Sequence, residues 1–252
     1  MSNATNAHTA RLDLRGKRAL ITGGTTGIGR AIAVLLASYG VKVFICGRNP
    51  DYLADALKRI REVGEGDGVA LDLSDPDKVD ALFAASKAYL GGLDIAVVNA
   101  AISAEGLSET SEKDLRYAIA TDFTAYLLSA HAAFEQMEGE GDIVLIGSMS
   151  AHVLGPSSTV YAGIKAGIAG FSEALRRELG PKGVRVSLVE PGKTGSDMQL
   201  PDVPVEKQRE MIREGSMLRA EDIAVGVHYV LTQPSRTVVQ QVTIAPREQA
   251  KE

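Results

Sequence analysis

The chain has 252 residues, of which 45% are hydrophobic and 23% charged, with a net charge of −5 and one cysteine, Cys46. This length suits one large domain, the mild acidity argues against a nucleic-acid partner, and a lone cysteine excludes an internal disulfide and fits a reducing compartment. No apolar stretch reaches membrane-spanning length, and the polar N-terminus lacks the apolar core of a signal peptide. We therefore expect a cytoplasmic protein with a disordered tail over residues 1–10 and one domain over residues 11–252.

Seven apolar runs predict the strands of the domain. Several are continuous rather than alternating, which is typical of parallel strands covered on both faces. Amphipathic stretches between them predict helices, including a long one from about Ser111 to Met137. The pattern predicts an α/β fold, a doubly wound (Rossmann-type), mostly parallel sheet with helices on both faces. The runs are Arg18–Thr22, Lys42–Cys46, Gly68–Leu71, Ile95–Asn99, Ile143–Gly147, Arg185–Glu190 and Val239–Ile244.

The first run is followed by the glycine-rich turn "TGGTTGIG", with Gly23, Gly27 and Gly29 leading into a helix over residues 27–39. The N-terminus of a helix presents unpaired amides and a positive dipole end, which attract phosphate. Glycine lets a pyrophosphate approach those amides and supplies the backbone angles that the turn needs. The pattern predicts a dinucleotide site, the alternative being a connecting turn that binds nothing.

The tips of the next three strands carry further candidates for this site. The second strand ends in Arg48 with no acid, which favours the 2′-phosphate of NADP over NAD, the alternative being a solvated surface arginine. Asp72, after the third strand, is placed to meet the adenine amino group or, alternatively, to cap a helix. The fourth strand ends in Asn99, Ala100 and Ala101, small residues where the backbone passes close to a cofactor or simply leaves the strand in a tight turn.

A candidate reaction centre follows the fifth strand. Tyr161 and Lys165 are four residues apart and so share one helix face, where the ammonium would lower the pKa of the phenol and fit it for acid–base work. Ser148 lies thirteen residues before Tyr161, at the carboxyl end of a strand where parallel sheets bind ligands. The alternative for the pair is a surface tyrosine–lysine contact. No G-x-S-x-G elbow marks Ser148 as a nucleophile.

One long polar segment interrupts the alternation of strands and helices. Residues 192–218 lie between the sixth strand and the next helix, and such insertions are usually substrate lids or disordered loops. We expect a substrate lid here, although its side chains cannot be placed from the sequence. The four histidines and the one cysteine are widely scattered, so no metal site is expected.

Together these motifs resemble the short-chain dehydrogenase/reductase family, in its short single-domain branch, over about residues 14–245. "TGGTTGIG" is similar to the family's T-G-x-x-x-G-I-G turn, "NAA" to its N-A-G, Ser148 with "YAGIK" to its catalytic set, and "PGKTGS" to its P-G-x-x-x-T element. The resemblance implies reversible oxidation of an alcohol to a carbonyl, with hydride passing between substrate and nicotinamide. Tyr161 would move the proton, Lys165 would lower its pKa and bind the nicotinamide ribose, and Ser148 would orient the substrate.

The resemblance also implies the cofactor site and the partners. The cofactor is NADP, with NAD as an alternative, the substrate is a small alcohol or carbonyl compound, and the assembly is a homodimer or homotetramer built on the long helices. The cofactor residues implied are Gly23, Thr25, Thr26, Gly27, Ile28, Gly29, Arg48, Asp72, Leu73, Asn99, Ala100, Ala101, Tyr161, Lys165, Pro191, Gly192, Thr194 and Ser196.

Asp122 is the main departure from the family pattern, because the family usually has asparagine there to hold a water that links the lysine to solvent. We count Asp122 among the catalytic residues, and its charge either blunts the effect of Lys165 on Tyr161 or is a harmless exchange. A cofactor-binding regulator without turnover is therefore the alternative function. A sugar-nucleotide epimerase or dehydratase is a third, against which the glycine spacing and the short chain both count.

Overall fold

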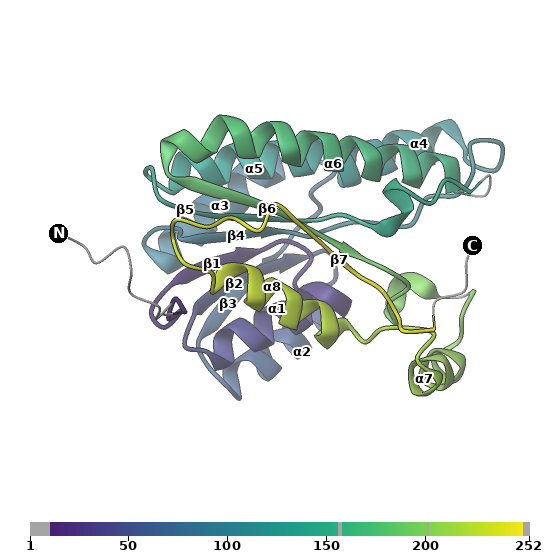
Figure 1. Cartoon of the computed structure of the whole chain (residues 1–252), viewed down its shortest axis with the longest axis horizontal. Helices are drawn as coiled ribbons and strands as arrows, with labels where there is room; N and C mark the ends of the chain where they lie inside the picture. Colours follow the sequence, from purple (N-terminus) through teal and green to yellow (C-terminus); the bar gives the residue numbers. More distant parts are fainter. Residues whose placement is uncertain (1–10, 156–157, 201, 249–252) are drawn as a thin grey trace, which may run out of the picture.

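Seven parallel strands form one sheet in the part of the chain that the computed structural model describes, residues 11–155, 158–200 and 202–248. The tail predicted over residues 1–10 lies outside the described residues. The sheet order is β3-β2-β1-β4-β5-β6-β7, which confirms the predicted fold class (Figure 1). The strands are β1 (Arg18–Ile21), β2 (Lys42–Gly47), β3 (Gly66–Ala70), β4 (Ile95–Val98), β5 (Gly141–Ile146), β6 (Val184–Pro191) and β7 (Gln241–Ile244).

Helices cover both faces of the sheet, with α1, α2 and α8 on one side and α3, α5 and α6 on the other (Figure 1). The α-helices are α1 (Gly27–Ser38), α2 (Pro50–Arg61), α3 (Pro76–Leu90), α4 (Glu112–Ile119), α5 (Ala125–Gln136), α6 (Thr159–Leu179), α7 (Val205–Glu214) and α8 (Ala220–Leu231). A π-helical turn, η1 (Ala120–Thr124), joins α4 to α5. Short 3-10 turns are η2 (Met149–Ala151), η4 (Gly180–Lys182) and η5 (Asp197–Gln199).

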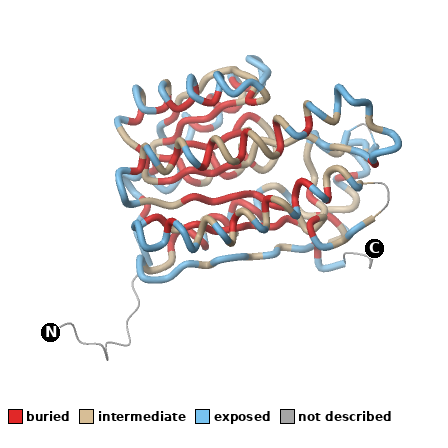
Figure 2. Tube along the Cα trace, turned by 90° about the horizontal axis from the view of Figure 1, so that it is seen from above, coloured by how far each residue is buried: buried red, intermediate tan, exposed pale blue. Residues whose placement is uncertain are grey.

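The two helical layers produce two separate hydrophobic cores. Successive strand residues point to opposite faces, so Ile21 packs with α1 and α8 while its neighbour Leu20 packs with α3 and α5. This is why the central strands β1, β2, β4 and β5 are mostly apolar, and Figure 2 shows the interior of the sheet buried and the outer faces of the helices exposed.

The helix starts follow the capping residues in the sequence. Asn49 caps α2, accepting hydrogen bonds at its Oδ1 from the backbone N–H groups of Asp51 (2.8 Å) and Tyr52 (3.2 Å), and Pro50 takes the first helical position. Ser111 caps α4 through the backbone N–H of Asp114. The helix expected from Ser111 to Met137 is present as α4, η1 and α5 in one run.

The order of the strands locates the ligand edge. Strands β2 and β3 extend the sheet to one side of β1, and β4 to β7 extend it to the other. In such sheets ligands bind outside the carboxyl ends of the strands, in the crevice where the order reverses. Here that crevice lies between the ends of β1 and β4.

The segment over residues 192–218 is more ordered than the sequence predicted. It contains η5 and the ten-residue helix α7, which the loop prediction missed. The base of the segment is closed, because Thr194 forms a parallel bridge with Leu218 and the N–H of Gly195 donates to the carbonyl of Leu218 (2.9 Å). Gln208 on α7 is buried and donates through Nε2 to the carbonyl of Val203 (2.8 Å).

Candidate active site

The glycine turn after β1 is fastened to the end of β4. The Thr22 hydroxyl accepts hydrogen bonds from the backbone N–H groups of Asn99 (2.9 Å) and Ala100 (3.0 Å). In return the Asn99 side-chain amide donates to the carbonyls of Thr22 (3.0 Å) and Gly23 (3.2 Å). These bonds hold the two strand ends as one rigid edge, so Asn99 has a positioning role that the sequence did not indicate.

Two of the glycines are required by the backbone itself. A Cβ on Gly29 would lie 2.1 Å from the carbonyl oxygen of Gly23, and Gly27 has a φ of +51°, in the left-handed region. The helix start that they shape has no side-chain cap, since Thr26 makes no capping bond and the first turn of α1 contains no acid. Its amides are therefore available to a phosphate.

The other predicted cofactor residues surround this turn. Ser196 lies close to it, because a Cβ on Gly27 would be 3.2 Å from the Cβ of Ser196. Thr194 is buried and its hydroxyl donates to the carbonyl of Gly192 (2.9 Å). Thr25, Thr26 and Ile28 lie in or directly after the turn, Leu73 is buried after β3, Ala101 follows β4, and Pro191 ends β6.

At the far end of this edge, Arg48 and Asp72 are joined by a residue that the sequence did not single out. Arg48 donates through Nη1 to the hydroxyl of Tyr117 on α4 (2.6 Å), and that hydroxyl donates to Oδ2 of Asp72 (2.8 Å). Asp72 also accepts at Oδ1 from the backbone N–H of Ser74 (3.0 Å). Burial alone would raise the pKa of Asp72, but the bonds from Ser74 and Tyr117 and the charge of Arg48 lower it below its ordinary value.

The three residues of the predicted reaction centre come together near the end of β5. Ser148 follows β5, and its Oγ accepts from the backbone N–H of Ser150 (3.1 Å). Tyr161, in the first turn of α6, is close enough to the Ser148 side chain for that hydroxyl to act on the pKa of its phenol. The Nζ of Lys165, one turn later, is 5.5 Å from the centre of the Tyr161 ring.

Lys165 is buried, with only 2% of its surface exposed, and its ammonium is hydrogen-bonded inside the protein. Its Nζ donates to the carbonyl of Ile146 (3.2 Å) and to the hydroxyl of Tyr126 (3.4 Å), and it lies 4.9 Å from the Tyr126 ring. Burial lowers the pKa of Lys165 to about 8, although the charge of Asp122 works in the opposite direction. The lysine is therefore mostly charged at neutral pH.

The pKa of Tyr161 differs from the sequence expectation. Although part of the ring is accessible, the phenol is surrounded by protein, and burial together with the charge of Asp122 raises its pKa to about 12, against a lowering effect of the Ser148 hydroxyl. The expected lowering by Lys165 is not found, because its ammonium is directed to Tyr126 and Ile146. Tyr161 is thus a protonated phenol at neutral pH.

Asp122 lies in the π-helical turn η1 and is completely buried. Its Oδ1 accepts a hydrogen bond from the backbone N–H of Ile102 (2.8 Å), just beyond Ala101, while Oδ2 has no hydrogen-bond partner among the described residues. Burial raises the pKa of Asp122 to about 6, with the charge of Lys165 acting against the shift. A carboxylate thus stands where it influences both Lys165 and Tyr161.

The sequence places His152 at the mouth of the expected pocket but does not indicate its partner, Glu190. His152, the residue after η2, places Nε2 3.0 Å from both carboxylate oxygens of Glu190 near the end of β6. Glu190 is completely buried and also accepts from the side-chain amide of Gln241 (2.7 Å). The pair ties the loop after Ser148 to the last two strands.

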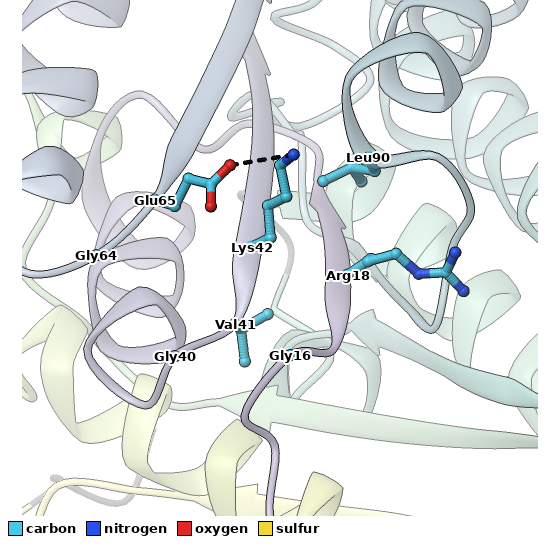
Figure 3. Close-up of a pocket in the computed structure, with 8 residues that line it drawn as sticks. All are labelled: Gly16, Arg18, Gly40, Val41, Lys42, Gly64, Glu65 and Leu90. Carbon is cyan, nitrogen blue, oxygen red and sulfur yellow. Dashed lines mark ion pairs between the residues drawn. The ribbon is translucent and has the colours of Figure 1, made fainter.

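The hollow drawn in Figure 3 lies at the opposite edge of the sheet. It measures about 570 Å³ and is lined by Arg18, Lys42 and Glu65 among others, at the amino ends of β1 and β2. Lys42 pairs with Glu65 across it (3.0 Å). None of the predicted site residues lines it, so it is separate from the candidate active site.

The described ranges contain neither a cluster of metal-ligating side chains nor a membrane-spanning helix. They contain no group of three or more histidine, cysteine, aspartate or glutamate residues suited to hold a metal ion. Within the same ranges, no helix is both long and apolar enough to cross a membrane.

Comparison with known proteins identifies the family. The model of the family described as "short chain dehydrogenase" matches residues 17–206. The chain belongs to this family. An uncharacterised oxidoreductase of Staphylococcus aureus is 30% identical over 237 residues, covering 92% of this chain and 98% of the relative. One from Staphylococcus saprophyticus is 30% identical over 240 residues, covering 93% and 99%.

Solved structures of the short-chain dehydrogenase family have the same fold. A short-chain dehydrogenase from Burkholderia cenocepacia, in complex with NADP, superposes with a TM-score of 0.83 at 30% identity, covering 93% of this chain and 98% of that one. A variant of actinorhodin polyketide ketoreductase with NADPH gives a TM-score of 0.81 at 27% identity, covering 91% and 96%. The chain is thus an oxidoreductase of this family.

Proposed function

We propose that this protein is an NADP(H)-preferring oxidoreductase that interconverts a small alcohol and its carbonyl compound. The observation that carries the proposal is the joining of Ser148, Tyr161 and Lys165 at the same sheet edge as the glycine turn. A hydrogen-bonding hydroxyl, a protonated phenol and a buried cation are what proton transfer to a carbonyl oxygen requires.

The residues around the turn fit a dinucleotide phosphate group. The uncapped start of α1, the glycines that a Cβ would fill and the nearby Ser196 would hold the pyrophosphate. Arg48 favours a 2′-phosphate, and the relatives that were solved with NADP or NADPH support the same choice. When bound, the nicotinamide would supply or accept the hydride.

The raised pKa of Tyr161 favours the direction of carbonyl reduction. A phenol that stays protonated at neutral pH can give its proton to the substrate oxygen as the carbonyl carbon becomes an alcohol carbon. The Ser148 hydroxyl would orient that oxygen. Lys165 would bind the nicotinamide ribose, and Asp122, in turn, would keep Lys165 charged.

Segment 192–218 is the proposed substrate lid. The Thr194–Leu218 bridge holds the two ends of the segment together, and α7 lies between those ends. In the proposal, the residues between the bridge and α7 cover the substrate beside the glycine turn. The proposal thus assigns substrate selection to η5 and to the loop after Ser148.

The proposed assembly is a homodimer or homotetramer, in a protein that we expect to be cytoplasmic. The exposed side of α6 carries Gly163, Ala166 and Gly170, and a Cβ built on either glycine meets no atom within 4 Å. A surface with such small side chains allows a second helix to approach closely. Sedimentation velocity of the purified chain measures the assembly directly.

Replacing Tyr161 with phenylalanine tests the proposal. Turnover of NADPH against a panel of ketones, sugars and oxo acids should fall by about 10²- to 10⁴-fold, because the proton donor is lost, while NADPH affinity measured by calorimetry changes little. Tyr229→Phe, on the exposed phenol of α8, is the control. Undiminished turnover in Tyr161→Phe would reject the assignment. Tight NADPH binding without turnover of any panel compound in the wild type would favour the regulator instead.

A further inference from the structure

Tyr117 connects three separate segments at the nucleotide end of the site. Arg48 follows β2, Asp72 follows β3, and Tyr117 comes from the far side of the cleft on α4. The Tyr117 hydroxyl is 2.6 Å from Nη1 of Arg48 and 2.8 Å from Oδ2 of Asp72. Among the described residues, the exposed Arg48 side chain has no other hydrogen bond.

Chemistry fixes the direction of both hydrogen bonds. An ionised carboxylate only accepts and a guanidinium only donates, so the phenol donates its proton to Asp72 and accepts from Arg48. Burial and the bond to Asp72 raise the pKa of Tyr117, which keeps the phenol protonated in this chain of bonds. The order is therefore guanidinium, phenol and carboxylate, with the phenol separating the two charges.

This separation determines what Arg48 can bind. One of the five guanidinium N–H groups is used by Tyr117, which leaves most of the donor fork for an anion. Without the hydroxyl, the flexible arginine could collapse onto Asp72 as a direct ion pair and lose those donors. The hydrogen bond to Tyr117 also restricts the rotamers of Arg48 before a ligand binds, so less side-chain entropy is lost on binding.

We propose that Tyr117 is a specificity-determining residue for the 2′-phosphate of NADP(H), and that it acts by positioning Arg48. The inference rests on the proposed function, because it assumes that the edge holds a nicotinamide dinucleotide. It goes beyond it by assigning cofactor discrimination to a helix on the opposite side of the cleft from the arginine.

The test measures binding, so it does not depend on turnover. Calorimetric affinities for NADPH, NADH and 2′,5′-ADP are compared in the wild type, Tyr117→Phe, Arg48→Ala and the double variant, with Tyr229→Phe as the matched control. Tyr117→Phe should weaken NADPH and 2′,5′-ADP by about three- to tenfold, as expected for one hydrogen bond, and leave NADH unchanged. In the Arg48→Ala background the same substitution should have no further effect, because Tyr117 acts through the arginine.

Two results would overturn the inference. One is unchanged discrimination in Tyr117→Phe while Arg48→Ala abolishes it. The other is an equal loss of NADPH and NADH affinity, which would assign Tyr117 to the adenine that both cofactors share. Failure of the proposed function looks different: the wild type itself would bind NADPH no more tightly than NADH, or would bind neither.

Discussion

Two aspartates, one at each end of the candidate site, titrate in opposite directions. Asp72, at the nucleotide end, is half-buried and has hydrogen bonds on both carboxylate oxygens, and its pKa lies below the ordinary value. Asp122, at the reaction end, is completely buried with only one oxygen bonded, and its pKa rises to about 6. A nearby cationic side chain acts to lower the pKa of each aspartate, so positive charge alone does not decide the direction of the pKa shift.

The difference lies in burial and in hydrogen bonding together: at Asp122 desolvation dominates, whereas at the less buried Asp72 the hydrogen bonds and the charge of Arg48 together outweigh it. At the nucleotide end Arg48 and Tyr117 hold a satisfied network open to solvent. At the reaction end Lys165 directs its hydrogen bonds to Tyr126 and Ile146, and Asp122 keeps an unpartnered oxygen. The carboxylate at the nucleotide end, Asp72, therefore stays ionised at neutral pH, whereas the carboxyl group at the reaction end, Asp122, has a pKa of about 6.

Removing the buried cation should have the largest effect on this contrast. Lys165→Met should lower kcat by about 10²-fold or more, because the site loses the ammonium proposed to hold and orient the nicotinamide ribose. The chain should still fold, since Asp122 can take up a proton once the lysine charge that opposes this is gone. The rate of NADPH oxidation and thermal unfolding measure the two effects. Turnover at the wild-type rate would show that the ammonium has no part in the reaction.

The two aspartates themselves should respond with opposite signs. Because the folded pKa of Asp122 is raised from 3.8 to about 6, the wild type loses stability as the pH rises through that window. Asp122→Asn should remove this pH-dependent loss, so its stability relative to the wild type should be higher at pH 7 than below pH 4. Urea unfolding at several pH values measures it.

Asp72→Asn is the matched comparison. Its folded pKa is lowered, so its ionised form stabilises the fold above the ordinary pKa, and that stability is lost as the pH falls through the folded value. The variant should therefore be less stable than the wild type at pH 7, and the difference should shrink on acidification. The same sign for both aspartates would contradict the contrast drawn here.

The exposed arginine should affect cofactor choice and little else. Arg48→Ala should raise KM for NADPH by about 10- to 100-fold, the range for a charge-assisted contact to phosphate, with KM for NADH and kcat at saturation nearly unchanged. Steady-state kinetics with each cofactor measure the split. Equal effects on both cofactors would remove Arg48 from the discrimination.

The smallest effect is expected at the amino edge of the sheet. Lys42→Ala breaks the ion pair with Glu65 beside the hollow of Figure 3, and such a surface pair contributes less than about 1 kcal/mol. NADPH affinity should not change. A change would show that this hollow communicates with the carboxyl edge.

The sequence predicted the parts of the molecule that depend on local pattern. All seven strands occur within a few residues of their predicted places, and the capping residues Asn49 and Ser111 begin their helices. Continuous apolar runs, glycine positions and caps are set by neighbours along the chain, so they can be interpreted without knowing the tertiary structure.

The missed residues depend on how distant segments meet. Tyr117 and Tyr126 lie on the helical run around Asp122, and their contacts follow from where that run crosses the ends of β3 and β5. The π-helical turn η1 shifts the helix phase at that point, and no sequence pattern indicated it. For Tyr126, the one signal available in the sequence was its spacing of four residues from Asp122. The lowered pKa expected for Tyr161 was wrong for the same reason, since Lys165 faces Tyr126.

The strand order also governs the biogenesis of this protein. The central strand β1 pairs with β2 on one side but with β4 on the other, and Arg18 bonds to Asp94, 76 positions further along the chain. A ribosome adds about 5 to 20 residues per second, so β1 waits for several seconds with the backbone N–H and C=O groups of one edge unpaired. Truncated products that end before Ile95 lack the partner for that edge. We expect such fragments to aggregate during translation unless a chaperone shields them.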